Sequence, residues 1–231
     1  TYASWPDNKA EIAAALADTG IEGWQAKLPT WEAGEKVATR NAGKKVLDAL
    51  LDVVPGLIGG GADLTGNTGV QMPDDAGVFS VENRKGRQIH FGVREHAMGS
   101  IMNGLALHGG ALPVGGTFFV FSDYMRPPVR LAALSGAKVI YSWTHDSVGV
   151  GEDGPTHQPI EHLASLRAMP GLRVFRPADA NETAAGYRVA IEADSGPTAL
   201  VLSRQNLPVL EGTTDHTGAM KGAYTLYGID D

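Results

Sequence analysis

The sequence contains no cysteine, so it can form neither a disulfide nor a thiolate metal site, which fits a reducing cytoplasm. It also lacks a long apolar run. Residues 104–122 carry no Lys, Arg, Asp or Glu, but His108, several glycines and Pro113 interrupt the apolar stretch of about 20 residues that a membrane span needs. No signal-peptide pattern opens the sequence. We therefore expect no membrane partner.

Acidic residues outnumber basic residues, and the formal net charge is −7. This balance argues against a nucleic-acid partner, because phosphate backbones bind basic surfaces. An anionic ligand would have to be bound by a few local arginines.

The 231 residues, 43% of them hydrophobic, suffice for one large core. Thr1 is not an initiator methionine, and a strand-like pattern begins at 223–227, so we expect a segment of a longer polypeptide. Three parts are predicted: a helix and connector of a preceding domain (1–36), an α/β domain (37–210), and a linker with the start of a C-terminal domain (211–231).

Strand-like and helix-like segments alternate along the chain, which predicts an α/β fold with a mainly parallel sheet and helices on both faces. Pro127 and Pro128 are tolerated best in a first helical turn, so that helix is predicted to begin there. The predicted strands are 57–64, 88–91, 112–121, 137–143, 172–175 and 198–202, and the predicted helices are 9–17, 37–54, 94–109, 127–134, 160–167 and 180–192.

A polar, glycine-rich loop at 149–160 (GVGEDGPTHQPI) follows the predicted strand at 137–143. Loops in this position carry binding and catalytic groups in open α/β sheets. His145, Asp153 and His157 lack the spacing of a metal site, so hydrogen bonds to hydroxyl groups and to a phosphate suit them better.

Two patterns resemble ligand motifs but have simpler explanations. The run 59–61 (GGG) lacks the spacing of a nucleotide-binding loop. Asp153 and Asn181 mimic the spacing of a magnesium diphosphate site, but Glu152 replaces the expected glycine, and Asn181 before Glu182 is typical of a helix N-cap.

Phe118, Phe121 and Tyr124 recur every three residues. This spacing fits core packing, or an aromatic slot for a flat ring. Glu95 after a strand is typical of a first-turn helix acid. The small residues within 94–109 would let that helix approach another helix or a cofactor closely.

Seven motifs extend over 38–208: ATRNA (38–42), GGGADL (59–64), IHFGVREHAMGSIMNGLALHGG (89–110), TFFVFSDYMRP (117–127), THDSVGVGEDGPTHQPIEHLASLR (144–167), FRPAD (175–179) and GPTALVLSRQNLP (196–208). Taken together, these motifs resemble the middle, pyrimidine-binding domain of transketolases, and imply the pyrimidine-type thiamine diphosphate-binding fold.

The resemblance implies that thiamine diphosphate is the cofactor. Glu95 matches the family's catalytic glutamate, which hydrogen-bonds a pyrimidine nitrogen and must keep its proton near neutral pH, as burial favours. Phe118, Phe121 and Tyr124 match the aromatic pocket around the pyrimidine. Asp63 matches a residue that helps to place the cofactor across the subunit boundary of a homodimer.

The resemblance also implies a sugar phosphate site. His145 and Asp153 match residues that contact the sugar hydroxyls, while Arg40, His157 and Arg204 match the site of the phosphate. The bidentate guanidinium explains two of these three. Both histidines are expected to act in catalysis.

The sequence departs from the family pattern at two positions and by one absence. Asn67 stands where many members have a serine for the phosphate, and His96 stands where many have an aromatic residue. The Gly-Asp-Gly motif and asparagine that hold Mg²⁺ and the diphosphate belong to a preceding domain. The chain is therefore expected to carry no metal ligands, half of an active site, and no activity when isolated.

The activity implied for the parent protein is transfer of a two-carbon ketol unit between sugar phosphates in the pentose phosphate pathway. Dihydroxyacetone synthase, deoxyxylulose phosphate synthase and a non-catalytic dimerising domain remain alternatives. Arg40 and Arg204 favour the alternatives in which the substrates are phosphorylated.

Overall fold

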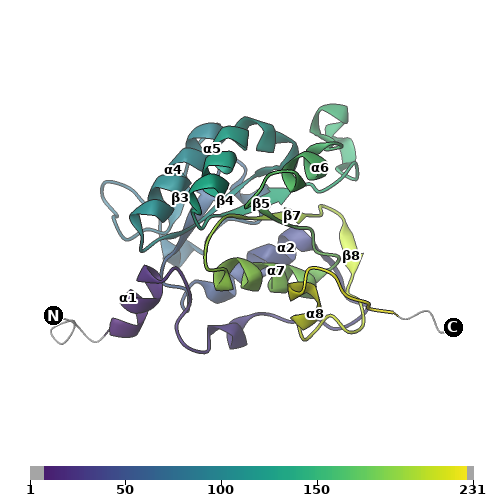
Figure 1. Cartoon of the computed structure of the whole chain (residues 1–231), viewed down its shortest axis with the longest axis horizontal. Coiled ribbons are helices and arrows are strands. Elements are labelled where there is room, and N and C mark those ends of the chain that lie inside the picture. The colour runs from purple at the N-terminus through teal and green to yellow at the C-terminus, as the bar shows by residue number, and fades with distance from the viewer. Residues whose placement is uncertain (1–7, 228–231) are drawn as a thin grey trace.

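The computed structural model describes residues 8–227 and places a six-stranded parallel sheet at the centre of the chain (Figure 1). The strands lie in the order β3-β2-β4-β5-β7-β6. The predicted α/β fold is confirmed. The strand bounds are β2 (Leu57–Gly61), β3 (Gln88–His90), β4 (Leu112–Phe118), β5 (Ile140–Thr144), β6 (Arg173–Phe175) and β7 (Thr198–Leu202).

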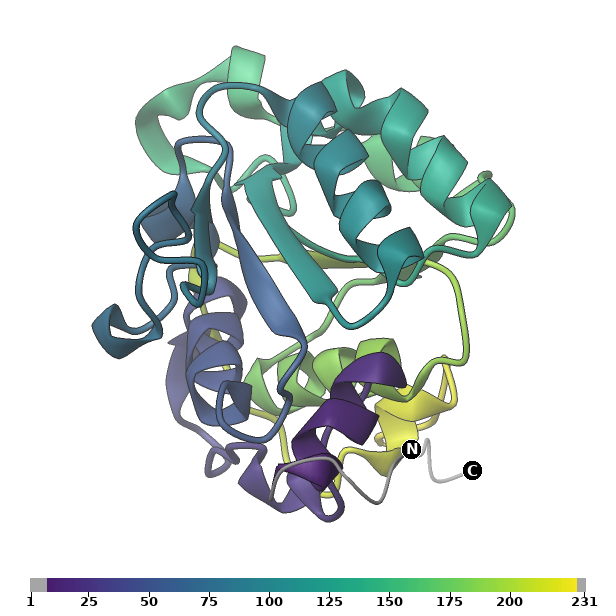
Figure 2. The same ribbon diagram turned by 90° about the vertical axis from the view of Figure 1, so that its left-hand side faces the viewer.

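Helices cover both faces of this sheet (Figures 1 and 2). One face carries α4 (Glu95–His108), α5 (Ser122–Ser135) and α6 (His162–Arg167), and the other carries α2 (Thr39–Leu50) and α7 (Ala180–Glu192). Shorter elements are α1 (Lys9–Leu16), α3 (Thr65–Thr68) and α8 (Thr217–Met220), together with the antiparallel pair β1 (Lys36–Ala38) and β8 (Asn206–Pro208).

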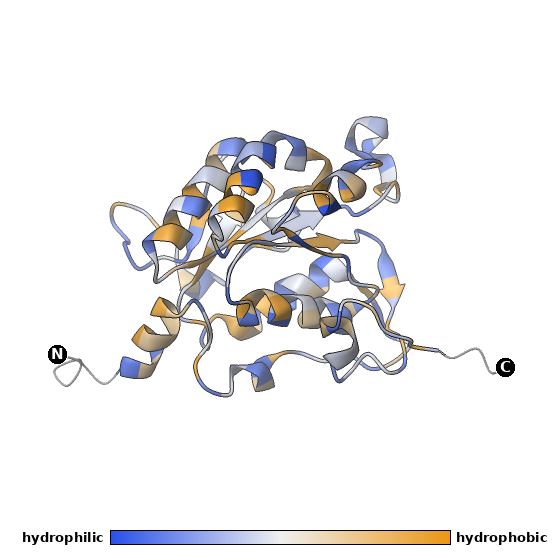
Figure 3. Cartoon of the chain, viewed as in Figure 1, coloured by the Kyte–Doolittle hydropathy of each residue, from blue (hydrophilic) through white to orange (hydrophobic). Residues whose placement is uncertain are grey.

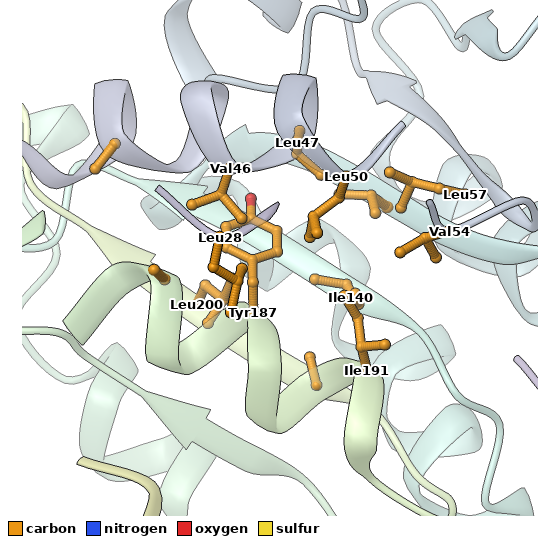
Figure 4. Close-up of a cluster of buried hydrophobic side chains, with 14 of the residues drawn as sticks. Leu28, Val46, Leu47, Leu50, Val54, Leu57, Ile140, Tyr187, Ile191 and Leu200 are labelled. Atoms are coloured by element: carbon orange, nitrogen blue, oxygen red, sulfur yellow. The ribbon is translucent and has the colours of Figure 1, made fainter. Parts of the chain in front are cut away.

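The core has two parts because β5 is buried on both faces. Ile140 points into the cluster between α2, α7 and the sheet, whereas Tyr141 and Trp143 belong to the cluster under α4 and α5. Figure 4 shows the first cluster, in which Val46 and Leu50 of α2 face α7.

Hydrophobic and hydrophilic residues alternate along α4 and α5, as expected for helices that bury one side (Figure 3). Within residues 8–227, no helix is both long and apolar enough to cross a bilayer.

The glycine run forms a strand, β2, packed closely between its neighbours. A Cβ atom on Gly60 would lie 1.8 Å from the Ile89 carbonyl oxygen, and one on Gly59 would lie 2.1 Å from the Val114 carbonyl oxygen. The glycines therefore serve strand packing.

Helix α5 begins at Ser122, so the predicted start at Pro127 is wrong. Both prolines lie inside the helix, where each leaves one carbonyl without its usual donor. Those carbonyls belong to Asp123 and Tyr124, which are solvent-exposed, so water can hydrate them. Pro128 packs against α4, because a Cβ atom on Gly99 would lie 2.8 Å from its ring. The predicted close approach of α4 to another helix is confirmed.

The assignment of Asn181 as a helix cap is also wrong. Asp179 is the N-cap of α7 and accepts from the Glu182 N–H, 2.8 Å away. Asn181 is buried and holds the N-terminal connector, because it accepts from the Trp31 N–H (2.9 Å) and donates to the Trp31 carbonyl (3.0 Å).

Two boundaries differ from prediction at the ends of the domain. The predicted helix 37–54 divides into β1 and α2, because residues 36–38 pair with β8. The strand-like residues 223–227 form no strand. Instead, the Tyr224 hydroxyl donates to Glu182 at 2.7 Å and holds this segment on α7.

The sheet has a topological switch point between β2 and β4. From β2 the chain continues to the edge strand β3, and β4 then pairs with the other side of β2. The loops that follow β2 and β4 therefore diverge, which opens a crevice at the carboxyl ends of the strands where ligands bind in such sheets.

Candidate functional site

Three aromatic residues and two histidines meet beyond the carboxyl end of β4. The Phe118 and Phe121 rings lie 5.9 Å apart, and the Phe121 and Tyr124 rings lie 5.8 Å apart. The ring centroid of His157 lies 5.3 Å from that of Phe121, and the ring centroid of His145 lies 4.9 Å from that of Phe118. Because Tyr124 is 64% exposed and both phenylalanines are only partly buried, this aromatic cluster is open to one side and is not core packing.

Arg40 and Arg204 are held near one another by the residues that precede them. Thr39 and Ser203 are buried and exchange hydrogen bonds across 164 positions of sequence. The Ser203 N–H donates to Thr39 Oγ1 at 2.7 Å, and the Thr39 N–H donates to Ser203 Oγ at 3.1 Å. Sequence reasoning missed both residues, and the only available signal was that each stands directly before an arginine.

The two guanidinium groups form a local cationic site. Burial and the nearby charge of Arg204 lower the pKa of Arg40. Arg40 donates to the Asn67 backbone carbonyl at 3.0 Å, and its Nε has no partner in the part of the chain that the structure describes. Among residues 8–227, neither arginine forms an ion pair with a carboxylate. An anion would offset the repulsion between them.

The glycine-rich loop lies against Arg204. Gly151 has a φ of 81°, and a Cβ atom there would lie 2.5 Å from Arg204 Nη1. Glycine is favoured at this position by its backbone conformation, and a side chain there would also displace the Arg204 guanidinium. The loop begins at an ion pair in which Arg176 donates to Asp146 at 2.8 Å, and it presents Asp153 to solvent.

His145 is buried, at 4% exposed, and its Nδ1 lies 2.7 Å from Thr144 Oγ1. Burial, together with the charges of Arg40 and Arg204, lowers its pKa to about 4, and Asp153 opposes this shift only in part. The imidazole is therefore neutral near pH 7. Because Nδ1 contacts Thr144 Oγ1, Nε2 is the ring nitrogen left for a ligand, as donor or acceptor according to the tautomer.

The depressed pKa predicts how stability depends on pH. The pKa of His145 has its ordinary value of 6.5 in the unfolded chain and is about 4 in the folded chain. Between these values the unfolded state binds more protons, so the free energy of unfolding falls as pH falls, by up to about 3 kcal/mol. In the His145→Asn variant, the free energy of unfolding should lose most of this dependence on pH. Above pH 6.5, the wild type and the variant should both depend little on the pH through this position.

Urea denaturation at about pH 7.5 and about pH 5 measures this difference. The exposed His108, changed to Asn, is the matched control. An equal loss of stability in the wild type and in His145→Asn would contradict the assigned effect.

Glu95 is the first residue of α4 and is 9% exposed. Within residues 8–227 its side chain has no hydrogen bond or ion pair, although buried polar groups are normally paired. The residue is largely buried, but its carboxyl oxygens are not among the buried unpaired atoms and so remain open to a ligand. Such a carboxyl, with an open aromatic cluster at the same edge of the sheet, fits a flat heteroaromatic ring that carries a nitrogen acceptor.

The loop after β2 contributes the two remaining predicted residues. Asp63 is exposed and has a φ of 65°, which is uncommon for a residue other than glycine and is found preferentially at functional sites. Asn67 is exposed in α3, and its backbone carbonyl accepts from Arg40. Both lie at the switch point between β2 and β4.

Comparison with known proteins assigns this architecture to a family. The profile of the family "Transketolase, pyrimidine binding domain" matches residues 35–209. The chain is 53% identical to the transketolase of Geobacillus stearothermophilus over 223 residues, which are 96% of this chain and 33% of the relative.

Solved structures agree with the sequence match. The structure of transketolase from Leishmania mexicana superposes with a TM-score of 0.92 at 46% identity, covering 99% of this chain and 34% of that one. The Pichia stipitis transketolase in complex with sedoheptulose 7-phosphate gives 0.92 at 45% identity, with the same coverage. The chain thus spans about a third of the length of its relatives. It belongs to the transketolase pyrimidine-binding domain family.

Proposed function

We propose that the parent protein transfers a two-carbon ketol unit between sugar phosphates with thiamine diphosphate, and that this chain supplies the half-site for the pyrimidine and the sugar phosphate. The observation that carries the proposal is that Arg40 and Arg204, which form no ion pair with a carboxylate within residues 8–227, lie beside the neutral His145. The sugar phosphate in the Pichia stipitis complex supports the same substrate class.

The aromatic cluster and Glu95 would hold the cofactor ring. Phe118, Phe121 and Tyr124 offer ring faces and edges to a flat heterocycle, and the Glu95 carboxyl donates a hydrogen bond to a ring nitrogen. When bound, thiamine diphosphate supplies the electron sink that lets the carbon–carbon bond beside a ketone break. Asp63 helps to place the cofactor from the loop after β2.

The substrate half of the site is electrostatic. Arg40 and Arg204 bind the phosphate through charge-assisted hydrogen bonds, and His157 adds a third contact from the glycine-rich loop. His145 and Asp153 hydrogen-bond the sugar hydroxyls and fix the position of the reacting carbonyl. The Asn67 amide can donate to the phosphate from α3.

The remaining parts of the enzyme are proposed from the family. Residues 37–210 form the pyrimidine-binding unit, 1–36 belong to a preceding domain, and 211–231 lead to a C-terminal domain. The parent protein acts as a homodimer in the cytoplasm, and its Mg²⁺ ligands lie outside this chain. The extent of the family match, residues 35–209, supports this division.

An acceptor screen with the full-length protein tests the proposed function. Because Arg40 and Arg204 select for a phosphate, we expect ketol transfer to ribose 5-phosphate with a kcat/KM at least about 10-fold above that for formaldehyde, as one charge-assisted hydrogen bond would give. Faster transfer to formaldehyde would instead indicate a dihydroxyacetone synthase.

A further inference from the structure

We propose that Asp123, Glu161 and His162 form a binding site for a divalent transition metal of the Zn²⁺ type, which joins α5 to α6. Asp123 lies in the first turn of α5, Glu161 precedes α6, and His162 is its first residue. One ligand atom from each residue lies within 4.8 Å of the other two.

His162 points to a ligand because it is buried and unsatisfied. The residue is 4% exposed, and its ring packs 5.4 Å from the ring of Phe119. Among the described residues 8–227, neither ring nitrogen has a hydrogen-bond partner. A neutral imidazole carries one donor and one acceptor, and burial removes both from water. A buried His162 is therefore unfavourable unless a ligand binds to one of its ring nitrogens.

The distances fit an ion shared between His162 and Asp123. His162 Nε2 lies 3.2 Å from Asp123 Oδ2 without the alignment of a hydrogen bond. Two donors that each lie about 2.1 Å from a tetrahedral ion are about 3.4 Å apart. Glu161 Oε2 lies 3.9 Å from His162 Nδ1, and its side chain is 73% exposed, so it can rotate to become the third ligand.

The donor set selects the metal. One imidazole nitrogen with two carboxylates suits Zn²⁺, whereas Mg²⁺ and Ca²⁺ prefer oxygen donors alone. Two carboxylates also balance the double charge of the ion. Three protein ligands leave one position of the tetrahedron for water or an added ligand.

In the sequence, the site adjoins both the aromatic cluster and the glycine-rich loop. Asp123 stands between Phe121 and Tyr124, and Glu161 follows the loop that carries His157. A bound ion would tie the start of α5 to the end of this loop. Zn²⁺ is thus expected to hold the loop in place independently of the cofactor.

Calorimetric titration of the purified, chelator-treated chain with Zn²⁺ tests this site. We expect one Zn²⁺ to bind per chain. His162→Gln and Asp123→Asn should each weaken this binding at least about 10-fold, because each substitution removes one ligand of the ion. His108→Gln, which changes an exposed histidine at the end of α4, should bind like the wild type. At a hundredfold excess over Kd, Zn²⁺ should raise Tm by about 5 °C or more.

The side chain of Asp123 is 56% exposed, so Asp123→Asn tests the site even where His162→Gln fails to fold. Binding unchanged in both variants overturns the proposal. No binding to the wild type, together with a His162-dependent gain in stability as the pH is lowered, also overturns it and identifies an imidazolium paired with the two carboxylates instead.

Discussion

Replacing Glu95 with alanine in the full-length enzyme is expected to lower kcat by about 10²–10⁴-fold, the usual contribution of a positioned acid or base. The residue is 9% exposed, and its carboxyl has no partner within residues 8–227, so its hydrogen-bonding capacity is free for a ligand. Alanine removes the group that we propose donates to the ring nitrogen. Glutamine keeps the size and a donor but cannot exchange a proton, so it should recover only part of the activity.

Steady-state kinetics at saturating thiamine diphosphate measure this effect on the chemical step apart from cofactor affinity. Glu192→Ala is the matched control, because Glu192 is an exposed glutamate on α7, across the sheet from α4. A kcat near that of the wild type would show that the role of Glu95 has been assigned wrongly.

The order of elements followed from the sequence because each signal was local. The helix 180–192 and the strand 198–202 were predicted with the observed bounds. The start of α5 was not, because the usual cost of Pro128 inside a helix is offset by its contact with Gly99 of α4. Such a contact joins two elements, and no rule about neighbouring residues can show it.

The candidate site likewise combines features that the sequence indicated with features that only the fold shows. The types of residue in the glycine-rich loop already indicated hydrogen bonding and phosphate binding. The coupling between Arg40 and Arg204 depends on the buried pair Thr39 and Ser203, which the β1–β8 ladder brings together. The low pKa of His145 depends first on its burial and then on those two charges. Electrostatics of this kind becomes visible only when the fold is known.

Arg204→Ala should raise KM for phosphorylated acceptors by about 10–100-fold, as expected for the loss of charge-assisted hydrogen bonds to a phosphate. Unphosphorylated sugars of the same configuration should be almost unaffected, because they never used that charge. The folded protein should not lose stability, since Arg204 repels Arg40 and forms no ion pair within residues 8–227. Removing Arg204 should also raise the pKa of His145 above about 4.

Three measurements separate this role from a merely structural one. Arg204→Lys should fall between the wild type and alanine, because an ammonium keeps the charge but not the bidentate geometry. The exposed Arg84, changed to alanine, should leave both KM values unchanged. Titration of the His145 ring by NMR reports directly whether the charge of Arg204 reaches it. Equal losses with phosphorylated and unphosphorylated acceptors would mean that Arg204 positions the loop through Gly151 and does not bind the phosphate.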